Sequence, residues 1–111
     1  MLPYKFRLTK EKDYNLVFKN GKKLSNNYFR VCFLKNNLGY SRFGIIVSNK
    51  VSKKAVVRNL LKRRIRGILS DNLSNFNQNL DMVINLSPVV KKDLPFNDLS
   101  AGLLALLNKI I

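Results

Sequence analysis

Three cations at helical spacing are the residues of this sequence best suited to bind a charged partner. Arg58, Lys62 and Arg66 recur at every fourth position, so a helix would place them in one line. Like charges at this spacing weaken an isolated helix by about 0.2–0.5 kcal/mol per pair. Arg can contact a phosphate through two parallel hydrogen bonds, and Lys adds a point charge. We therefore predict a phosphate-binding surface, whose ligand would relieve this repulsion.

The positive charge of the chain is concentrated in the same region. The 111 residues include 21 Lys and Arg against 6 Asp and Glu, which gives a net charge of +15. The segment from Tyr14 to Ser70 holds fourteen cations and no acidic residue. A merely solvated surface would normally mix both signs. This excess indicates a polyanionic partner, either nucleic acid or an anionic membrane surface.

The same composition argues against catalysis by the side chains of this chain. It contains no His, and its six acidic residues are dispersed rather than paired, so no general acid–base site is apparent. The single cysteine, Cys32, excludes an internal disulfide and a Cys-cluster zinc site. We expect no metal or cofactor bound by the chain alone. We also expect no signal peptide, no membrane span and a cytoplasmic location.

The elements that position these residues follow from hydrophobic periodicity and turn residues. We predict a first helix from the N-cap Thr9 to Asn20-Gly21, and a central helix over Lys53–Leu73. Strands are predicted at Tyr28–Lys35, Arg42–Ser48 and Leu80–Leu86, with a short edge strand at Lys22–Ser25. A final amphipathic helix starts at Pro95 or Asp98 and has Leu99, Leu103, Leu106 and Ile110 on one face.

The central helix separates into an apolar stripe and a basic arc when its residues are placed at 100° steps. The stripe, which should pack on the sheet, consists of Val57, Leu61, Ile65 and Ile68. The arc consists of Arg58, Asn59, Lys62, Arg63 and Arg66, with Arg64 flanking it. The order of elements predicts one α+β domain over residues 1–111, a sandwich of the type α-β-β-β-α-β-α.

The segment from Lys53 to Arg66 resembles the signature of the bacterial ribonuclease P protein component. That family carries a K-x-A-V-x-R-N-R-x-K-R-x-x-R helix directly after a strand. Ser41–Lys50 is similar to the preceding strand and loop, and Leu8–Gly21 to the family's first helix. Asp81–Ile84 resembles the fourth strand. The resemblance covers nearly the whole chain in the right order.

The resemblance implies a ribosomal protein S5 domain 2-like fold with a left-handed βαβ crossover, against the usual right-handed rule. It also implies two RNA-binding regions. Matching positions for the catalytic RNA are Lys53, Lys54, Arg58, Asn59, Lys62, Arg63, Arg64 and Arg66. Matching positions for a cleft that holds the single-stranded 5′ leader of precursor tRNA are Tyr14, Phe18, Arg30, Cys32 and Lys50. For Tyr14 and Phe18, packing in the core is an equally good interpretation.

The implied activity is that of a ribonucleoprotein endonuclease that removes the tRNA 5′ leader. Its RNA subunit would perform the chemistry with Mg²⁺, and this chain would bind ribonuclease P RNA and precursor tRNA. One residue departs from the family pattern, because Leu60 stands where the Arg-Asn-Arg core usually has its second Arg. The helix places Leu60 away from the apolar stripe, so it should be partly exposed, and one RNA contact should be missing or weakened.

Two other function classes are compatible with the composition. A small ribosomal protein of similar fold and charge would bind RNA without a leader cleft. A basic peripheral membrane protein fits less well, because the apolar side of the basic helix is needed for the core.

Overall fold

The computed structural model describes residues 2–76, 79–88 and 96–110. In chain order the elements are a 3₁₀ turn η1 (Tyr4–Phe6), α1 (Glu11–Asn20), β1 (Lys22–Ser25), β2 (Phe29–Lys35), β3 (Arg42–Ile46), α2 (Ala55–Asp71), a 3₁₀ turn η2 (Leu73–Asn75), β4 (Leu80–Leu86) and α3 (Phe96–Ile110). The predicted α-β-β-β-α-β-α order is confirmed.

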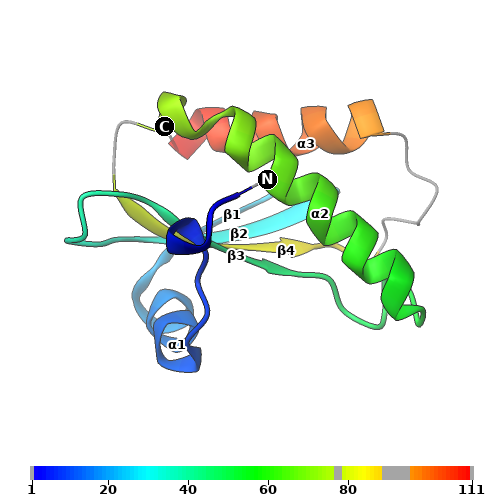
Figure 1. The fold of residues 1–111 in the computed structure, drawn as a ribbon, viewed down its shortest axis with the longest axis horizontal. Coiled ribbons are helices and arrows are strands. Elements are labelled where there is room, and N and C mark those ends of the chain that lie inside the picture. Colours follow the sequence, from blue (N-terminus) through cyan, green and yellow to red (C-terminus); the bar gives the residue numbers. More distant parts are fainter. Residues whose placement is uncertain (1, 77–78, 89–95, 111) are drawn as a thin grey trace.

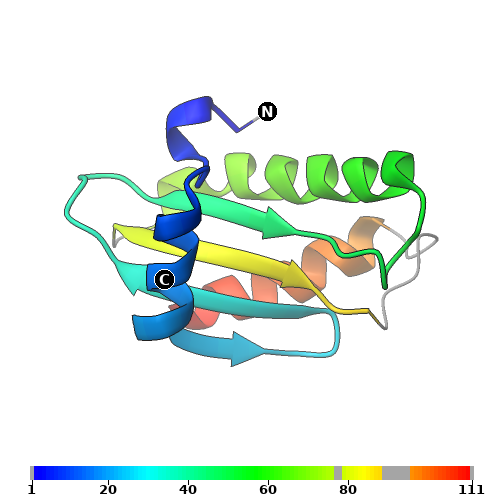
Figure 2. The same ribbon diagram turned by 90° about the horizontal axis from the view of Figure 1, so that it is seen from below.

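These elements form three layers, with the sheet in the middle. Helices α2 and α3 lie side by side on one face, and α1 lies alone on the other (Figure 1). Seen from the α1 side, α1 runs across the strands rather than along them (Figure 2). Most of the core lies between the sheet and α2 with α3, where Phe29, Phe43, Ile65 and Leu103 are at most 2% exposed. A smaller cluster under α1 is centred on Val17 and Val83.

The strand order β1-β2-β4-β3 places β4 in the interior of the sheet. β4 pairs with β2 in antiparallel and with β3 in parallel orientation. With α2 toward the viewer and the parallel strands pointing up, β4 lies to the left of β3 (Figures 1 and 2). The crossover β3–α2–β4 is therefore left-handed, as the family resemblance implied and contrary to the usual preference.

Several predicted boundaries differ by a few residues. β4 has the predicted bounds, whereas β3 ends at Ile46 instead of Ser48, and α2 ends at Asp71 with η2 following. Pro95 lies outside the described residues. The predicted N-cap Thr9 is wrong: the cap is Lys10, with no side-chain hydrogen bond. The preceding segment is held on β3 instead, because the Leu8 amide donates to the Phe43 carbonyl at 2.8 Å.

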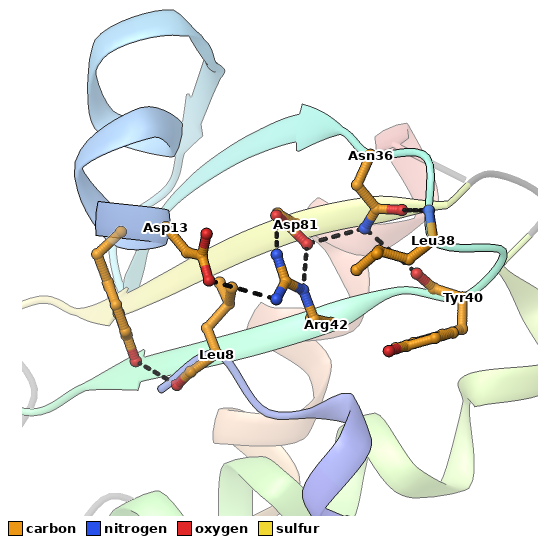
Figure 3. Close-up of polar contacts among 8 residues, drawn as sticks. Leu8, Asp13, Asn36, Leu38, Tyr40, Arg42 and Asp81 are labelled. Carbon is orange, nitrogen blue, oxygen red and sulfur yellow. Dashed lines mark hydrogen bonds and ion pairs between the residues drawn. The ribbon is translucent and has the colours of Figure 1, made fainter. Parts of the chain in front are cut away.

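One guanidinium group joins α1 to two strands. Arg42 of β3 donates from Nε and Nη2 to the two carboxylate oxygens of Asp81 on β4, at 2.9 and 2.6 Å (Figure 3). Its Nη1 donates to Asp13 of α1 at 3.3 Å. Asn36 adds a 2.8 Å bond to Asp81. The contacts of Arg42 with Asp81 and with Asp13 are the two ion pairs found within the described residues. Hydrogen bonding to Asp81 raises the pKa of Arg42.

We predict that Arg42→Met lowers the free energy of unfolding by about 3 kcal/mol, because it leaves the mostly buried Asp81 carboxylate without its cation. Asp13→Ala should cost about 1 kcal/mol, because Arg42 keeps Asp81. Urea unfolding followed by circular dichroism would measure both values, with the exposed Lys19→Met as the control. A change below about 0.5 kcal/mol for Arg42→Met would contradict this account.

Candidate nucleic-acid interface

The basic arc predicted for the central helix lies on the surface of the folded protein. Leu61, Ile65 and Ile68 are buried as predicted, while Val57 is half-buried, and Leu69 joins the stripe. We call Arg58, Asn59, Lys62, Arg63 and Arg66 the α2 basic face. Asn59 and Arg63 are exposed, whereas Arg58, Lys62 and Arg66 are half-buried along its border with the core. Arg64 lies on the opposite flank of the buried stripe, so it does not belong to this face.

The N-terminal approach to this helix contributes additional positive charge. Lys53 and Lys54 are exposed directly before α2, and Lys54 is its N-cap residue. Arg58 reaches back to the same turn, where its Nη1 donates to the Ser52 carbonyl at 3.0 Å. Leu60 is 38% exposed on the outer side of the helix, as predicted. The departure from the family pattern therefore removes a cation from an accessible position.

The sheet face under α1 can be described as three cross-strand rows. The first row contains Arg42 and Asp81, next to Leu34 of β2. The second row contains Gly44, Val83, Cys32 and Lys23, and the third contains Ile46, Asn85, Arg30 and Ser25. Helix α1 covers the first row and part of the second, through Asp13, Tyr14 and Val17. The third row therefore lies beside the helix rather than beneath it.

A groove of about 330 Å³ opens over this uncovered part of the sheet. We call it the sheet groove; its lining residues are Phe18, Lys23, Leu24, Ser25, Arg30, Val31, Cys32, Val83 and Asn85. Phe18 is 40% exposed, so it forms a wall of the groove and is not a core residue. The groove thus combines an accessible aromatic ring with the cations Lys23 and Arg30, which is the pattern used to stack bases and hold the backbone of single-stranded RNA.

Tyr14 and Lys50 were predicted to line this cleft, but neither is a lining residue of the sheet groove. The Tyr14 hydroxyl donates to the Leu8 carbonyl at 3.1 Å, and its ring lies over Gly44. A Cβ atom at Gly44 would lie 2.6 Å from Cε1 of this ring, so the glycine allows α1 to approach the sheet. Lys50 is exposed in the turn that follows β3.

Tyr14 instead belongs to a second, smaller hollow that connects α1 to the α2 basic face. This hollow of about 180 Å³ is also lined by Arg7 and Arg66. Burial lowers the pKa of Arg66, and the nearby charge of Arg7 lowers it further. Burial also raises the pKa of the Tyr14 hydroxyl. Two guanidinium groups thus share one hollow, and neither forms an ion pair within the described part of the chain.

Sequence reasoning missed several residues of these surfaces, among them the polar side chains Arg7, Lys23, Ser25 and Asn85. A signal for three of them was present, because the alternation of strand side chains places Lys23 and Ser25 on the same face as Cys32 and Arg30. Asn85 likewise interrupts an apolar strand at a position two residues from Val83. Arg7 carried no such signal, because its position depends on how residues before α1 lie along β3.

Comparison with known proteins identifies close relatives of this chain. A family model described as Ribonuclease P matches residues 2–111. The ribonuclease P protein component of Thermotoga maritima is 46% identical over 78 residues, which are 70% of this chain and 66% of that protein. The alignment thus spans just under two thirds of that relative. The component from a Pseudanabaena species is 38% identical over 93 residues, covering 83% of this chain and 80% of the relative.

Solved structures share the fold over nearly the full length. The RNase P protein of Staphylococcus aureus superposes with a TM-score of 0.87 at 27% identity, covering 95% of this chain and 94% of that one. The RNase P protein from Thermotoga maritima superposes with a TM-score of 0.85 at 38% identity, covering 95% of this chain and 97% of that one.

The single cysteine provides a test of the groove geometry. Burial raises the pKa of the Cys32 thiol, and the nearby Lys23 charge lowers it to a smaller extent. Because the thiolate is the reacting species, we predict slower alkylation of Cys32 by iodoacetamide at pH 8 than of an exposed thiol. The rate should keep rising at higher pH, where the reference thiol has already levelled off. Mass spectrometry would follow the reaction, with Asn15→Cys in a Cys32→Ser chain as the reference. If Cys32 and the Asn15→Cys reference were alkylated at equal rates at every pH, the burial of the Cys32 thiol would be contradicted.

Proposed function

Because this chain belongs to the ribonuclease P protein family, we propose that it is the protein subunit of ribonuclease P. This family is the protein partner of an RNA subunit in tRNA 5′ processing. In the proposed complex the chain binds ribonuclease P RNA and the 5′ leader of precursor tRNA. It thereby assists the endonucleolytic removal of the leader that produces the mature 5′ end.

The observation that carries this proposal is the sheet groove. Its exposed Phe18 ring offers a stacking surface, and Lys23 and Arg30 offer charge for the phosphates of the same strand. A leader has unpaired bases, whereas the mature tRNA lacks this segment. Binding in the groove would therefore favour precursor over product. A structural ribosomal protein would need no such groove, and the family match does not support that alternative.

The α2 basic face is the proposed contact with the RNA subunit. Lys53 and Lys54 extend it at its start, whereas Arg64 is a separate cation on the opposite flank of the buried stripe. Arg58, Lys62 and Arg66 meet no acidic partner within the described residues, so RNA phosphates would provide the missing negative charge. None of the described helices is long and apolar enough to cross a membrane.

The proposed complex requires Mg²⁺, which would act as a Lewis acid and water activator on the RNA. The described residues include no group of three His, Cys, Asp or Glu side chains that could hold a metal ion. We therefore assign no step of the reaction to a metal bound by the protein. The contribution of the chain is to bind and orient the two RNAs.

Reconstitution with a bacterial ribonuclease P RNA tests the proposal directly. At low Mg²⁺ the RNA alone should cleave precursor tRNA poorly, and the chain should raise kcat/KM by at least about tenfold, because its cations reduce the repulsion between the two RNAs. Cleavage would be followed by electrophoresis of 5′-labelled precursor. Absence of stimulation would exclude this function.

Two variants should separate the two proposed surfaces. Phe18→Ala should weaken precursor binding by about 5- to 150-fold, the range expected for loss of one stacked base, without changing the affinity for mature tRNA. Arg63→Gln should weaken assembly with the RNA subunit and make its salt dependence less steep by about one unit in log–log slope. Filter binding would measure both effects. The matched controls are the exposed Leu16→Ala on α1 and Lys19→Gln. Equal losses on precursor and mature tRNA for Phe18→Ala would contradict the leader assignment.

A further inference from the structure

A third hollow, larger than the sheet groove, lies at the other end of β2. Its volume is about 460 Å³. It is bordered by the start of β1, the ends of β2 and α3, and the last residue of α1, Asn20. Lys35 pairs with Leu80 at this end of β2, while Arg30 pairs with Asn85 toward the opposite end. Five residues of strand separate Arg30 from Lys35, which is about 17 Å. The two sites are therefore distinct.

The hollow has an apolar floor and a basic rim. Its apolar lining residues are Phe33, Leu34, Leu80 and Ile110, of which the first two are half-buried and accessible from outside. Its charged lining residues are Lys22, Lys35 and Lys109, all exposed. These lysines come from β1, β2 and α3, so their charges surround the floor from three elements. No acidic residue is among the described lining residues, and none of the ion pairs within the described part of the chain involves these lysines.

This combination restricts the kind of ligand that fits. A purely apolar ligand would leave three neighbouring ammonium groups with their mutual repulsion, and a bare anion would leave the apolar floor in contact with water. A suitable ligand has a flat apolar body that is flanked by negative charge. An unstacked nucleotide in an RNA chain has this form, since its base offers a π-face and phosphates lie on both sides.

We propose that the hollow rimmed by Lys22, Lys35 and Lys109 is a third RNA site, which takes one unpaired nucleotide. This inference rests on the proposed function, because it assumes that the chain works in a complex with RNA. The nucleotide could come from the RNA subunit or from precursor tRNA, which have the same chemistry. The C-terminal end of α1 lies between this site and the sheet groove. The site therefore anchors RNA that the groove and the α2 basic face do not reach.

Site-directed photo-cross-linking can identify the occupant. A photoactivatable azidophenacyl group would be attached to Lys35→Cys in a Cys32→Ser chain, and the holoenzyme would be assembled with precursor tRNA. The native chain, labelled at Cys32, is the control for the sheet groove. Ser74→Cys in the same Cys32→Ser background gives the level of cross-linking from an exposed position outside all three surfaces. Thermal melts would verify that each labelled chain is folded.

We expect the Lys35→Cys probe to cross-link to one or a few unpaired nucleotides, at least about fivefold above the Ser74→Cys level. Primer extension would show whether these nucleotides belong to the RNA subunit or to the precursor. Cross-links from Cys32 without any from Lys35→Cys above background would overturn this inference and leave the proposed function intact. Failure of both probes, together with no stimulation of cleavage, would instead reject the proposed function.

Charge removal gives an independent measurement of the same site. The triple variant Lys22→Gln, Lys35→Gln and Lys109→Gln should make the log–log salt slope of RNA affinity less steep by about 2, since each phosphate contact contributes about 0.7. The matched control removes three exposed charges elsewhere, through Lys10→Gln, Lys12→Gln and Lys19→Gln. If both triple variants change the slope equally, the effect reflects net charge alone and the proposed nucleotide site is rejected.

Discussion

The proposed leader-binding groove depends on the position of α1, which Arg42 helps to fix on the sheet. The guanidinium group of Arg42 bonds to both carboxylate oxygens of Asp81 and to Asp13, so it joins β3, β4 and α1 through one side chain. A partly buried pair of this kind has a large desolvation cost. The additional bonds that Arg42 donates to Asp13 and that Asn36 donates to Asp81 help to offset it. The cluster holds one end of α1 on the sheet, while Tyr14 rests on Gly44. The part of the sheet that α1 leaves uncovered forms the floor of the sheet groove.

This arrangement also explains how the chain tolerates its charge. Asp13 and Asp81 neutralise a single Arg within the structure, so they do not screen the α2 basic face or the groove. The remaining Lys and Arg side chains of these surfaces repel one another, and burial of Arg66 near Arg7 increases this cost. Such repulsion lowers the stability of the folded protein when no partner is bound. Binding of a polyanion would neutralise these charges, so the free energy of binding would include the loss of their repulsion.

Much of the fold could be predicted from periodicity, but the position of the groove could not. β4 has the predicted bounds because an apolar run ends at Ser87-Pro88, and the buried stripe of α2 follows from the 3.6-residue repeat. Thr9 failed as an N-cap because the residues before α1 pair with β3, a tertiary contact with no local signature. Tyr14 and Phe18 look alike in the sequence, yet one packs on Gly44 and the other lines the groove. The crossing direction of α1 decides between them. That direction depends on contacts with distant residues, namely the bond from Arg42 to Asp13, 29 residues away, and the packing of Tyr14 on Gly44.

The three-strand floor of the groove has a consequence for the life of the newly made chain. Phe18 comes from α1, Arg30 from β2 and Asn85 from the central strand β4, whose pairing with β3 must wait for α2 to cross over. Contacts between residues so far apart form slowly compared with those inside a helix. During synthesis, which proceeds from the N-terminus, the cations of α2 emerge from the ribosome before β4 does. A nascent chain therefore displays its charge before the groove is complete, and the proposed selectivity of the groove would arise only after the last strand has entered the sheet.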